Sequence, residues 1–545
     1  MEKWKTCRPL VAHLLQLPLL LLNLSLLVLF SLTYSVRIGL QFLGLVERRK
    51  YKEKRMTSGP KRKSEPKKRV CVVGVGSSGL ISVKECIENG MDVVAYEKCS
   101  SLGGAFNPGY EEGKFTSSNF LTAFSCFPCR AKDLPMHHWS FEEYLDYLAE
   151  FVKHFNIGDK LKYNHEVIEV KQVDGKWLVT VRDNISMDDE ASVFDNVIVC
   201  SGSNHVPHVP QVEGDDLFEG HSIHSSQYRS AKPFQDKNVL LVGMGESGSD
   251  IAYNISKVAK SLQIITRKGP GTVIGRRKHG TVADVDTTRA YHGLPKTFMK
   301  FQGLGVPLWH KLKIWIESLN NTKEDDALDA AMDNVKFTRY HWMSRYCTKS
   351  ENFLRAVTEH GSTYAETDIV ELAQDSVKMA DGSIYKCDAI VWCTGFAKNF
   401  SFLPSEFRKL QYRNDLWKKT FHPQFGIRIA FVGFARPNVG SIPPIAELQA
   451  RFTALAFAER VTLPSLEEME GLLKIDRDYE EWLFPWDYER VQSLCSYMET
   501  LMSWSRLLGC DIDLGRLIRN PRIAGRVMFG PLIPAQFRLF GQGNY

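Results

Sequence analysis

The chain of 545 residues is too long for one ordinary domain, and its 44% apolar and 24% charged residues are typical of folded globular proteins. Its net charge of +6 is concentrated near the N-terminus, because residues 47–69 carry twelve Lys or Arg against three Glu, whereas residues 70–545 have a net charge of −6. The acidic body argues against nucleic-acid binding. The twelve cysteines show no even framework and no paired metal-ligand spacing, so they fit a reducing compartment with free thiols better than a secreted disulfide scaffold.

The N-terminal segment contains a long apolar run. Residues 9–36 include no Asp, Glu, Lys or Arg, and nearly half of them are leucine. Because about 20 apolar residues span a bilayer as a helix, residues 1–46 are predicted to form a single transmembrane anchor. A cleaved signal peptide is the alternative, although its apolar region would be about 7–15 residues long. The basic linker at 47–68 follows the anchor, so the positive-inside rule predicts a body that faces the cytoplasm.

The body opens with a predicted buried strand at 70–73, followed by a glycine loop and a helix. Such a loop lets a pyrophosphate approach the backbone at the helix N-terminus. A second strand at 91–96 ends in Glu97, whose carboxylate can accept hydrogen bonds from ribose hydroxyls and would repel a 2′-phosphate. This pattern favours FAD or NAD over NADP. The predicted contacts are made by Gly74, Gly76, Ser77, Ser78, Gly79 and Glu97.

The same pattern recurs after a predicted strand at 238–242. The next strand, at 262–265, ends in Thr266 and Arg267 instead of an acid, and a guanidinium there is placed to bind a 2′-phosphate. A solvated basic strand end is the alternative reading of Arg267. Two nucleotide sites with opposite charges at the ribose position imply two cofactors, FAD in the first and NADPH in the second. The second loop contributes Gly243, Gly245, Ser247, Gly248, Ser249 and Asp250.

Several separated segments resemble the flavin-containing monooxygenases and their class B relatives. The stretch Phe218-x-Gly220-x-x-x-His224-x-x-x-Tyr228 resembles the motif that identifies them. Other segments that are similar to the family's occur in the family's order over about residues 68–545: Gly103 to Phe106, Ser118-Asn119 followed by Cys126-Phe127-Pro128, Asp388 to Phe396, Glu447 to Phe452, and Phe529 to Leu539.

The resemblance implies an α/β fold with two Rossmann-like dinucleotide-binding domains. We expect the FAD-binding domain at 69–212 and 389–545, and the NADPH-binding domain at 213–388 with an insertion at about 280–350. The family's chemistry implies that NADPH reduces FAD and that O2 then forms a flavin hydroperoxide, which a soft nucleophile such as an amine or a sulfide attacks. The resemblance makes Asn119 the catalytic residue and adds Gly104, Ala105, Phe106, Ser118 and His224 to the cofactor contacts.

Three departures from the family pattern affect these expectations. Phe106 and Phe396 stand where Trp and Tyr are usual, which alters flavin contacts. Glu246 replaces the usual Asn and places an acid near a pyrophosphate, which weakens the expectation of NADPH binding. The chain also ends in polar residues instead of an apolar tail, so the N-terminal anchor is expected to take its place, in the endoplasmic reticulum membrane.

Other functions remain open. Baeyer–Villiger oxygenation of a ketone is one, although Tyr228 stands where the commonest ketone-oxygenating type has Trp. An uncoupled NADPH oxidase or a degenerate binding protein is another. Cys126 and Cys129 form a CxxC pair that would suggest a flavin disulfide reductase, although incidental cysteines fit their position better. For the insertion at about 280–350 three interpretations stay open, which are contact with the membrane, a cover over the substrate channel, and ordinary helical core packing. The sequence does not indicate an oligomeric state.

Overall fold

The computed structural model describes residues 67–129, 136–204, 206–267, 272–273, 276–278, 281–292, 347–411, 415–484, 494–512 and 514–539. The chain divides into two compact units. One comprises Met1–Lys54 and Ile512–Asn520, and its described helix is α13 (Leu514–Arg519). The other comprises Arg55–Asp511 and Pro521–Tyr545, and contains all elements considered below.

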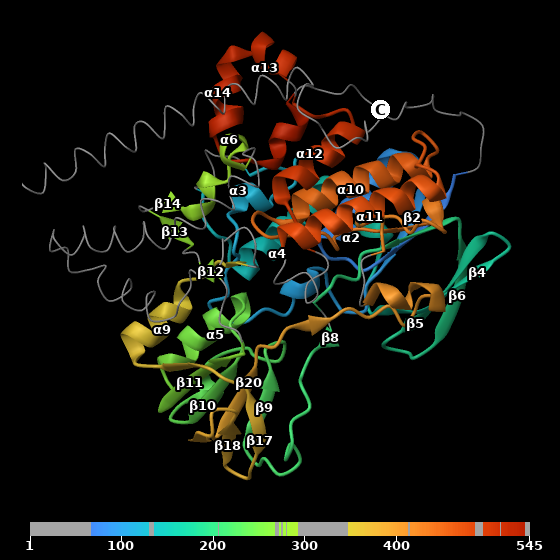
Figure 1. Cartoon of the computed structure of the whole chain (residues 1–545). Coiled ribbons are helices and arrows are strands. Elements are labelled where there is room, and N and C mark those ends of the chain that lie inside the picture. The colour runs from blue at the N-terminus through green and yellow to red at the C-terminus, as the bar shows by residue number, and fades with distance from the viewer. Residues whose placement is uncertain are drawn as a thin grey trace, which may run out of the picture. The chain divides into compact units, whose positions relative to one another are not determined.

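The first sheet is parallel and has the strand order β22-β7-β1-β2-β3. Its central strand β1 (Arg69–Val73) is buried on both faces, as its run of apolar residues predicts. The other strands are β2 (Asp92–Tyr96), β3 (Leu161–Lys162), β7 (Asn196–Val199) and β22 (Ile429–Phe431). Helix α2 (Ser77–Glu88) follows β1 and packs against both the sheet and α10 (Ile442–Phe457) (Figure 1).

We call the first sheet and the elements that pack on it the first domain, and the second parallel sheet described below belongs to the second domain. The first domain also contains an antiparallel sheet of β4 (His165–Val173), β5 (Lys176–Asp183) and β6 (Asp189–Phe194). Alternate residues of these strands point inward, so that Trp177 and Phe194 share a core with Cys71 and Val199 of the first sheet. Helix α4 (Phe141–His154) starts with a capping box in which Ser140 and Glu143 bond each other's backbone.

The second sheet is also parallel, with the order β16-β11-β10-β20-β9 (Figure 1). Its strands are β9 (His221–His224), β10 (Asn238–Val242), β11 (Ser261–Thr266), β16 (Thr363–Glu366) and β20 (Ala389–Trp392). Helices α5 (Glu246–Ser256) and α9 (Asn352–His360) pack against each other beside it. A small antiparallel sheet of β17 (Ile369–Leu372), β18 (Ser376–Met379) and β19 (Ile384–Lys386) precedes β20.

The position of β20 differs from the boundary predicted at residues 388 and 389. The strand pairs with β10 and β9 of the second sheet instead of returning to the first domain. The chain returns after it, through β21 (Phe396–Ala397), which pairs with β8 (Val206–Pro207) on the outward path. An apolar run such as 389–392 fits either parallel sheet, so pairing in space decided its place.

Helices form most of the last part of the first domain. Helices α10, α11 (Leu466–Leu483) and α12 (Tyr497–Leu507) bury Phe452, Met469 and Trp504 in the same core as α2 and α4. Short helices α3 (Asn119–Thr122), α6 (Arg289–His292) and α14 (Pro521–Phe529) complete the described helices of this unit.

No helix among the described residues is long and apolar enough to cross a bilayer. The anchor predicted at 1–46 lies outside those residues, together with the basic linker up to residue 66 and most of the insertion predicted at about 280–350.

Candidate functional site

The first glycine loop forms a tight connection between β1 and α2. Gly74 has a φ of +99°, and a Cβ there would lie 2.8 Å from the carbonyl oxygen of Cys200. A Cβ on Gly79 would lie only 1.9 Å from the Gly74 oxygen, so glycine is required for the helix to pack this closely on the strand. The helix N-cap is Gly76, without a side-chain cap. A tight glycine turn at the N-terminus of a helix is the geometry in which a strand–loop–helix unit can accept a phosphate group.

Glu97 lies directly after β2 and supports this loop. Its side chain is buried, with Oε2 accepting a hydrogen bond from the Val75 amide at 2.8 Å and Oε1 accepting one from Cys99 at 3.0 Å. The carboxylate therefore fixes the backbone between the first two glycines, and carboxylate oxygens have room for further donors such as ribose hydroxyls. Ser77 and Ser78 form the first turn of α2, where the Ser78 side chain lies against Gly433.

Gly104, Ala105 and Phe106 form a short 3-10 helix beside the first loop. Gly104 has a φ of +59°, and a Cβ on Gly76 would approach its Cα at 3.5 Å. The Phe106 ring packs in an aromatic cluster, with its centroid 4.4 Å from that of Phe115. The segment thus abuts the first cradle, while the partly buried Phe106 packs against the core.

The second glycine loop connects β10 to α5 in the same manner. Gly243 has a φ of +104°, and a Cβ on Gly248 would lie 2.4 Å from the Gly243 oxygen. Gly245 is the N-cap of α5, and no described residue lies within 4 Å of a Cβ placed there. The space in front of this helix N-terminus is therefore open to a pyrophosphate, and Ser247 lies in the first turn beside it.

The residues after β11 differ in exposure. The Thr266 hydroxyl is buried and lies 3.0 Å from the Tyr364 hydroxyl. The Arg267 side chain is 73% exposed and only 3.9 Å from the Asp368 carboxylate, a weak pair at a solvated surface. The guanidinium is thus accessible at the carboxyl end of β11, where a 2′-phosphate would lie.

Three residues predicted to contact cofactors also make contacts within the protein. Ser249 Oγ accepts a hydrogen bond from Phe353 N at 2.9 Å and donates to Ser350 O at 3.2 Å. The Asp250 carboxylate is buried and surrounded by donors of the protein itself. The His224 ring, at the end of β9, lies 2.9 Å from the Gly395 oxygen and packs edge-on against Phe396, so it contacts the segment by which the chain returns to the first domain.

The Glu246 carboxylate has a protein partner. Both of its oxygens lie 3.0 Å from the Lys349 amide nitrogen, and burial raises the pKa of this carboxyl although Lys349 acts in the opposite direction. The Lys349 amide therefore gives both oxygens of this carboxyl a donor within the protein. The expected weakening of NADPH binding by Glu246 stays a prediction.

Ser118 and Asn119 lie at the start of α3 and are fully buried. Asn119 Oδ1 accepts hydrogen bonds from the amides of Phe120 at 3.0 Å and His137 at 3.2 Å. Asn119 Nδ2 lies 3.3 Å from His137 Nδ1, and the Ser118 amide donates to Asp284 Oδ2 at 2.6 Å. The structure therefore holds the Asn119 amide in one orientation and connects its turn to the segment around Asp284.

The rest of the identifying motif has a packing role. Tyr228 is 1% exposed, and its ring stacks on Phe234 and packs edge-on against Tyr110. A Cβ on Gly220 would lie 2.8 Å from the Asp388 oxygen, so this turn requires glycine.

An ionic cluster that the sequence did not predict joins two of the family-like segments, through Glu447 and Arg538, to Ser125, which directly precedes Cys126. Arg538 donates to Glu447 Oε1 at 3.0 Å and to Ser125 Oγ at 2.6 Å, while Ser125 N donates to Glu447 Oε2 at 2.6 Å. Arg538 also lies 3.5 Å from Glu85, which pairs with Lys84 on α2. The sequence shows Glu447 and Arg538 in two separate segments. That they form an ion pair could be seen only in the folded structure.

The CxxC cysteines do not have the character of a redox pair. Both are free thiols, and burial raises the pKa of Cys126 well above its usual range and that of Cys129 to about 12. Because the thiolate is the reactive form, this argues against a disulfide reductase.

Comparison with known proteins agrees with two nucleotide cradles on parallel sheets. A family model for flavin-binding monooxygenase-like proteins matches residues 67–545. A 4-hydroxybenzoate brominase (decarboxylating) of Marinomonas mediterranea is 33% identical over 490 residues, covering 87% of this chain and 90% of the relative. Flavin-containing monooxygenase 5 of Homo sapiens is 28% identical over 510 residues, covering 88% and 90%.

Among solved structures, S-allyl-L-cysteine S-oxygenase from Allium sativum has the same fold, with a TM-score of 0.58 at 20% identity over 85% of this chain and 93% of that one. The match of the family model over the whole body, together with these relatives, shows that the chain belongs to the flavin-binding monooxygenase-like family.

Proposed function

We propose that this chain is a monooxygenase that transfers one oxygen atom of O2 to a soft nucleophile, an amine nitrogen or a sulfide sulfur, of a small molecule. Its cofactors are FAD and NADPH, as in its family. When bound, they supply the reducing electrons and the activation of O2. The proposed task of the protein is then to bind, orient and shield them.

The observation that carries the proposal is the pair of glycine cradles on separate parallel sheets. The first is followed by the buried Glu97 and the second by the exposed Arg267. Opposite charges at the two ribose positions suit one cofactor without and one with a 2′-phosphate. In this proposal FAD binds at Gly74, Gly76 and Gly79, and NADPH at the second loop.

Asn119 is the proposed catalytic residue. Its amide is buried and fixed by Phe120 and His137, so it enters the reaction already oriented. A donor held in place before the reaction costs no reorganisation when charge develops nearby. Its proposed task is to orient the reacting region of the flavin and the nicotinamide cofactor.

A second candidate is oxidation of bromide with halogenation of a hydroxylated aromatic acid. It is favoured by the 33% identity to a 4-hydroxybenzoate brominase over 87% of the chain. The two candidates share the steps that consume NADPH and O2 and differ in the acceptor, so an acceptor panel separates them.

The test uses the purified full chain with FAD, NADPH and 18O2. Tertiary amines, thioethers, cyclic ketones, and 4-hydroxybenzoate with and without bromide serve as acceptors. Products are identified by mass spectrometry, and NADPH consumption and H2O2 are measured in parallel. An N-oxide or sulfoxide that carries one 18O atom is the expected result.

Other outcomes would replace this proposal. A brominated phenol that forms only with bromide would establish the second candidate, and a labelled lactone would indicate a Baeyer–Villiger enzyme. Stoichiometric H2O2 with no oxygenated or halogenated product from any acceptor would indicate an oxidase. Lack of FAD in the folded protein would indicate a degenerate binding protein.

We further propose that residues 1–46 anchor the body on the cytoplasmic face of a membrane. The apolar run at 9–36 and the basic cluster at 47–69 support this proposal.

A further inference from the structure

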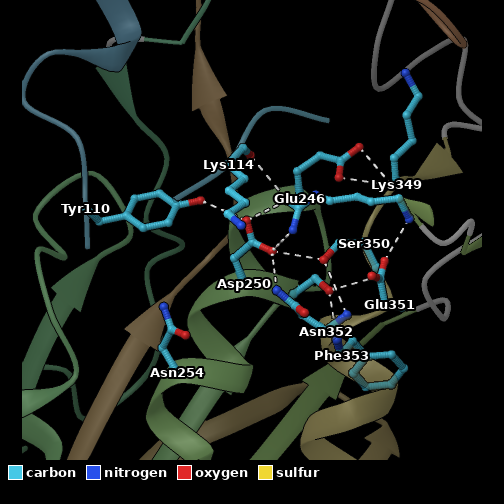
Figure 2. Close-up of polar contacts among 12 residues, drawn as sticks. Tyr110, Lys114, Glu246, Asp250, Asn254, Lys349, Ser350, Glu351, Asn352 and Phe353 are labelled. Atoms are coloured by element: carbon cyan, nitrogen blue, oxygen red, sulfur yellow. Dashed lines mark hydrogen bonds and ion pairs between the residues drawn. The ribbon is translucent and has the colours of Figure 1, made fainter. Parts of the chain in front are cut away.

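The Asp250 carboxylate lies at the centre of a buried polar cluster (Figure 2). Arg276 donates to it through two nitrogens, at 2.8 Å to Oδ1 and 2.7 Å to Oδ2. Ser350 Oγ and Asn352 Nδ2 each donate to Oδ1 at 2.9 Å. The side chains of Arg276 and Asp250 are only 8% and 3% exposed, so this forked ion pair is shielded from water.

The cluster also reaches the first domain. The Tyr110 hydroxyl donates to Asp250 Oδ2 at 3.3 Å, and Arg276 donates to the Lys114 carbonyl at 3.3 Å. His138 Nε2 lies 3.0 Å from the Arg276 carbonyl oxygen. The two charged residues therefore hold two segments of the FAD-binding domain, around residues 110–114 and at 138.

One face of α5 makes further contacts with the same segment of the first domain. Asn254, four residues after Asp250, donates to the Glu111 carbonyl at 3.4 Å, and Lys257 pairs with Glu112 at 2.9 Å. Residues spaced four and three apart share one side of a helix. The helix that starts at the second cradle thus lies along the 110–112 segment of the first domain.

The same cluster connects segments that adjoin the two cradles. Asp250 is two residues after Gly248, whereas Tyr110 follows the Gly104–Phe106 turn that abuts Gly76. A shift of α5 relative to Tyr110 would therefore move one cradle relative to the other.

Because Asp250 and Arg276 are charged and buried, their contact is sensitive to the loss of either side chain. Although burial favours the neutral form of Arg276, attraction by Asp250 outweighs it and raises the pKa of the guanidinium. A buried ion pair gives little net stability, but removing one member leaves an uncompensated charge. Its geometric specificity, more than its stability, distinguishes it from an apolar contact.

From these contacts we propose that Asp250 and Arg276 are positioning residues that set the distance and orientation between the two nucleotide cradles, and thereby control hydride transfer from NADPH to FAD. This inference rests on the proposed assignment of the two cradles. Neither residue is expected to touch a cofactor.

The test compares Asp250→Asn, Arg276→Met and Tyr110→Phe with the unchanged full chain in its FAD-bound form. Anaerobic stopped-flow measures flavin reduction by NADPH, and a separate reduction by dithionite followed by O2 measures reoxidation. Since a misplacement of about 1 Å costs ~100-fold in rate, we expect NADPH to reduce the first two variants ~10- to 100-fold more slowly. Reoxidation and the affinity for NADP+ should change less than about threefold.

Tyr110→Phe removes only one interdomain hydrogen bond, so it keeps the proposal testable if the charge variants fail to fold. A reduction rate about threefold lower at an unchanged melting temperature is expected. Glu359→Gln is the control, because it breaks an exposed ion pair with Arg355 in the same domain and should leave all rates unchanged.

Two results would overturn the inference. One is a normal NADPH reduction rate in folded, FAD-loaded Asp250→Asn and Arg276→Met proteins. The other is a loss confined to melting temperature and FAD content, which would make the pair merely structural. If the unchanged protein is not reduced by NADPH at all, the proposed function fails instead.

Discussion

At the scale of single residues, Asn119 combines a structural and a proposed catalytic role on different atoms. Its Oδ1 holds the turn by accepting from Phe120 and His137, whereas its Nδ2 is the donor group near His137 Nδ1. A substitution that keeps the oxygen and removes the donor can therefore separate the two roles.

Asn119→Asp is such a change. We expect a folded protein that retains FAD but forms product about 100-fold more slowly per flavin, in line with loss of one oriented donor in a catalytic site. Uncoupled H2O2 should rise in proportion. Product and peroxide assays at equal flavin concentration measure both, with the exposed Asn184→Asp as control. If Asn119→Asp forms product and H2O2 in the same ratio as the unchanged protein, Asn119 has only the structural role.

His224 leads to a prediction about pH. Its Nε2 lies 2.9 Å from the Gly395 carbonyl and its Nδ1 accepts from the Ser226 amide at 3.1 Å, an arrangement that fits the neutral ring with hydrogen on Nε2. Burial lowers the pKa of His224, although the Gly395 carbonyl acts in the opposite direction. The unfolded chain therefore takes up the proton first as pH falls.

Stability contributed by this histidine is present above its unfolded pKa of 6.5 and is lost as pH falls below that value toward the folded pKa. We expect His224→Gln to lose less stability than the unchanged protein between pH 7 and pH 5. The slope difference is at most about 1.4 kcal/mol per pH unit for one proton. Urea melts at several pH values measure it, and parallel curves for the two proteins would refute it.

At the scale of elements, the two strand–loop–helix units assign different tasks to their glycines. In the second loop, Gly248 is needed for close packing, because its Cβ would meet the Gly243 oxygen at 2.4 Å. Gly245 has a φ of −79°, which alanine adopts freely, and open space in front of it. The protein alone therefore does not require glycine at 245, but a bound pyrophosphate would.

We accordingly expect Gly245→Ala to keep its melting temperature while its affinity for NADP+ falls at least about tenfold, because a methyl group occupies the ligand's space. Gly248→Ala should lose about 1–3 kcal/mol of stability through overpacking. Calorimetric titration and thermal melts measure the two effects.

Gly471→Ala provides the control, because this exposed glycine in α11 has no neighbour within 4 Å and alanine should stabilise the helix by about 0.5–1 kcal/mol. Normal NADP+ affinity in Gly245→Ala would remove the second cradle from the proposed NADPH site.

The predictable part of these elements was local. The strands at 70–73 and 238–242 and their glycine loops follow from adjacent residues, and the structure has β1 and β10 there. Asp250 and Ser249 were assigned to the cofactor by their place in the loop. Their partners within the protein, Arg276, Ser350 and Phe353, lie 26 to 104 residues away. Sequence spacing cannot show such pairings, just as it could not decide which sheet receives β20.

At the scale of the whole molecule, charge is separated between the N-terminal part and the body. The N-terminal part contains the apolar run at 9–36 and the basic cluster at 47–69, the two features on which the proposed anchor rests. Residues 70–545 have a net charge of −6. An acidic body is not attracted to anionic lipids, so any membrane attachment should depend on the N-terminal part.

We therefore expect the full chain, expressed in eukaryotic cells, to stay in the membrane pellet through both 1 M salt and alkaline carbonate. A chain starting at residue 67 should appear in the supernatant. Release of the full chain by salt alone would indicate electrostatic attachment through the basic cluster, since salt screens charges but does not extract a spanning helix.

The side of the membrane on which the body lies can be tested at Asn184-Ile185-Ser186. This exposed turn is a glycosylation sequon, and its isoleucine is 76% exposed. A body on the cytoplasmic side leaves it unmodified, whereas a cleaved signal peptide would deliver it to the lumen, where it can be glycosylated. Two results together would show a cleaved signal peptide and no anchor. One is a mass shift that glycosidase removes and Asn184→Gln abolishes, and the other is an N-terminus beyond residue 8. The intact N-terminus with no shift is the expected result.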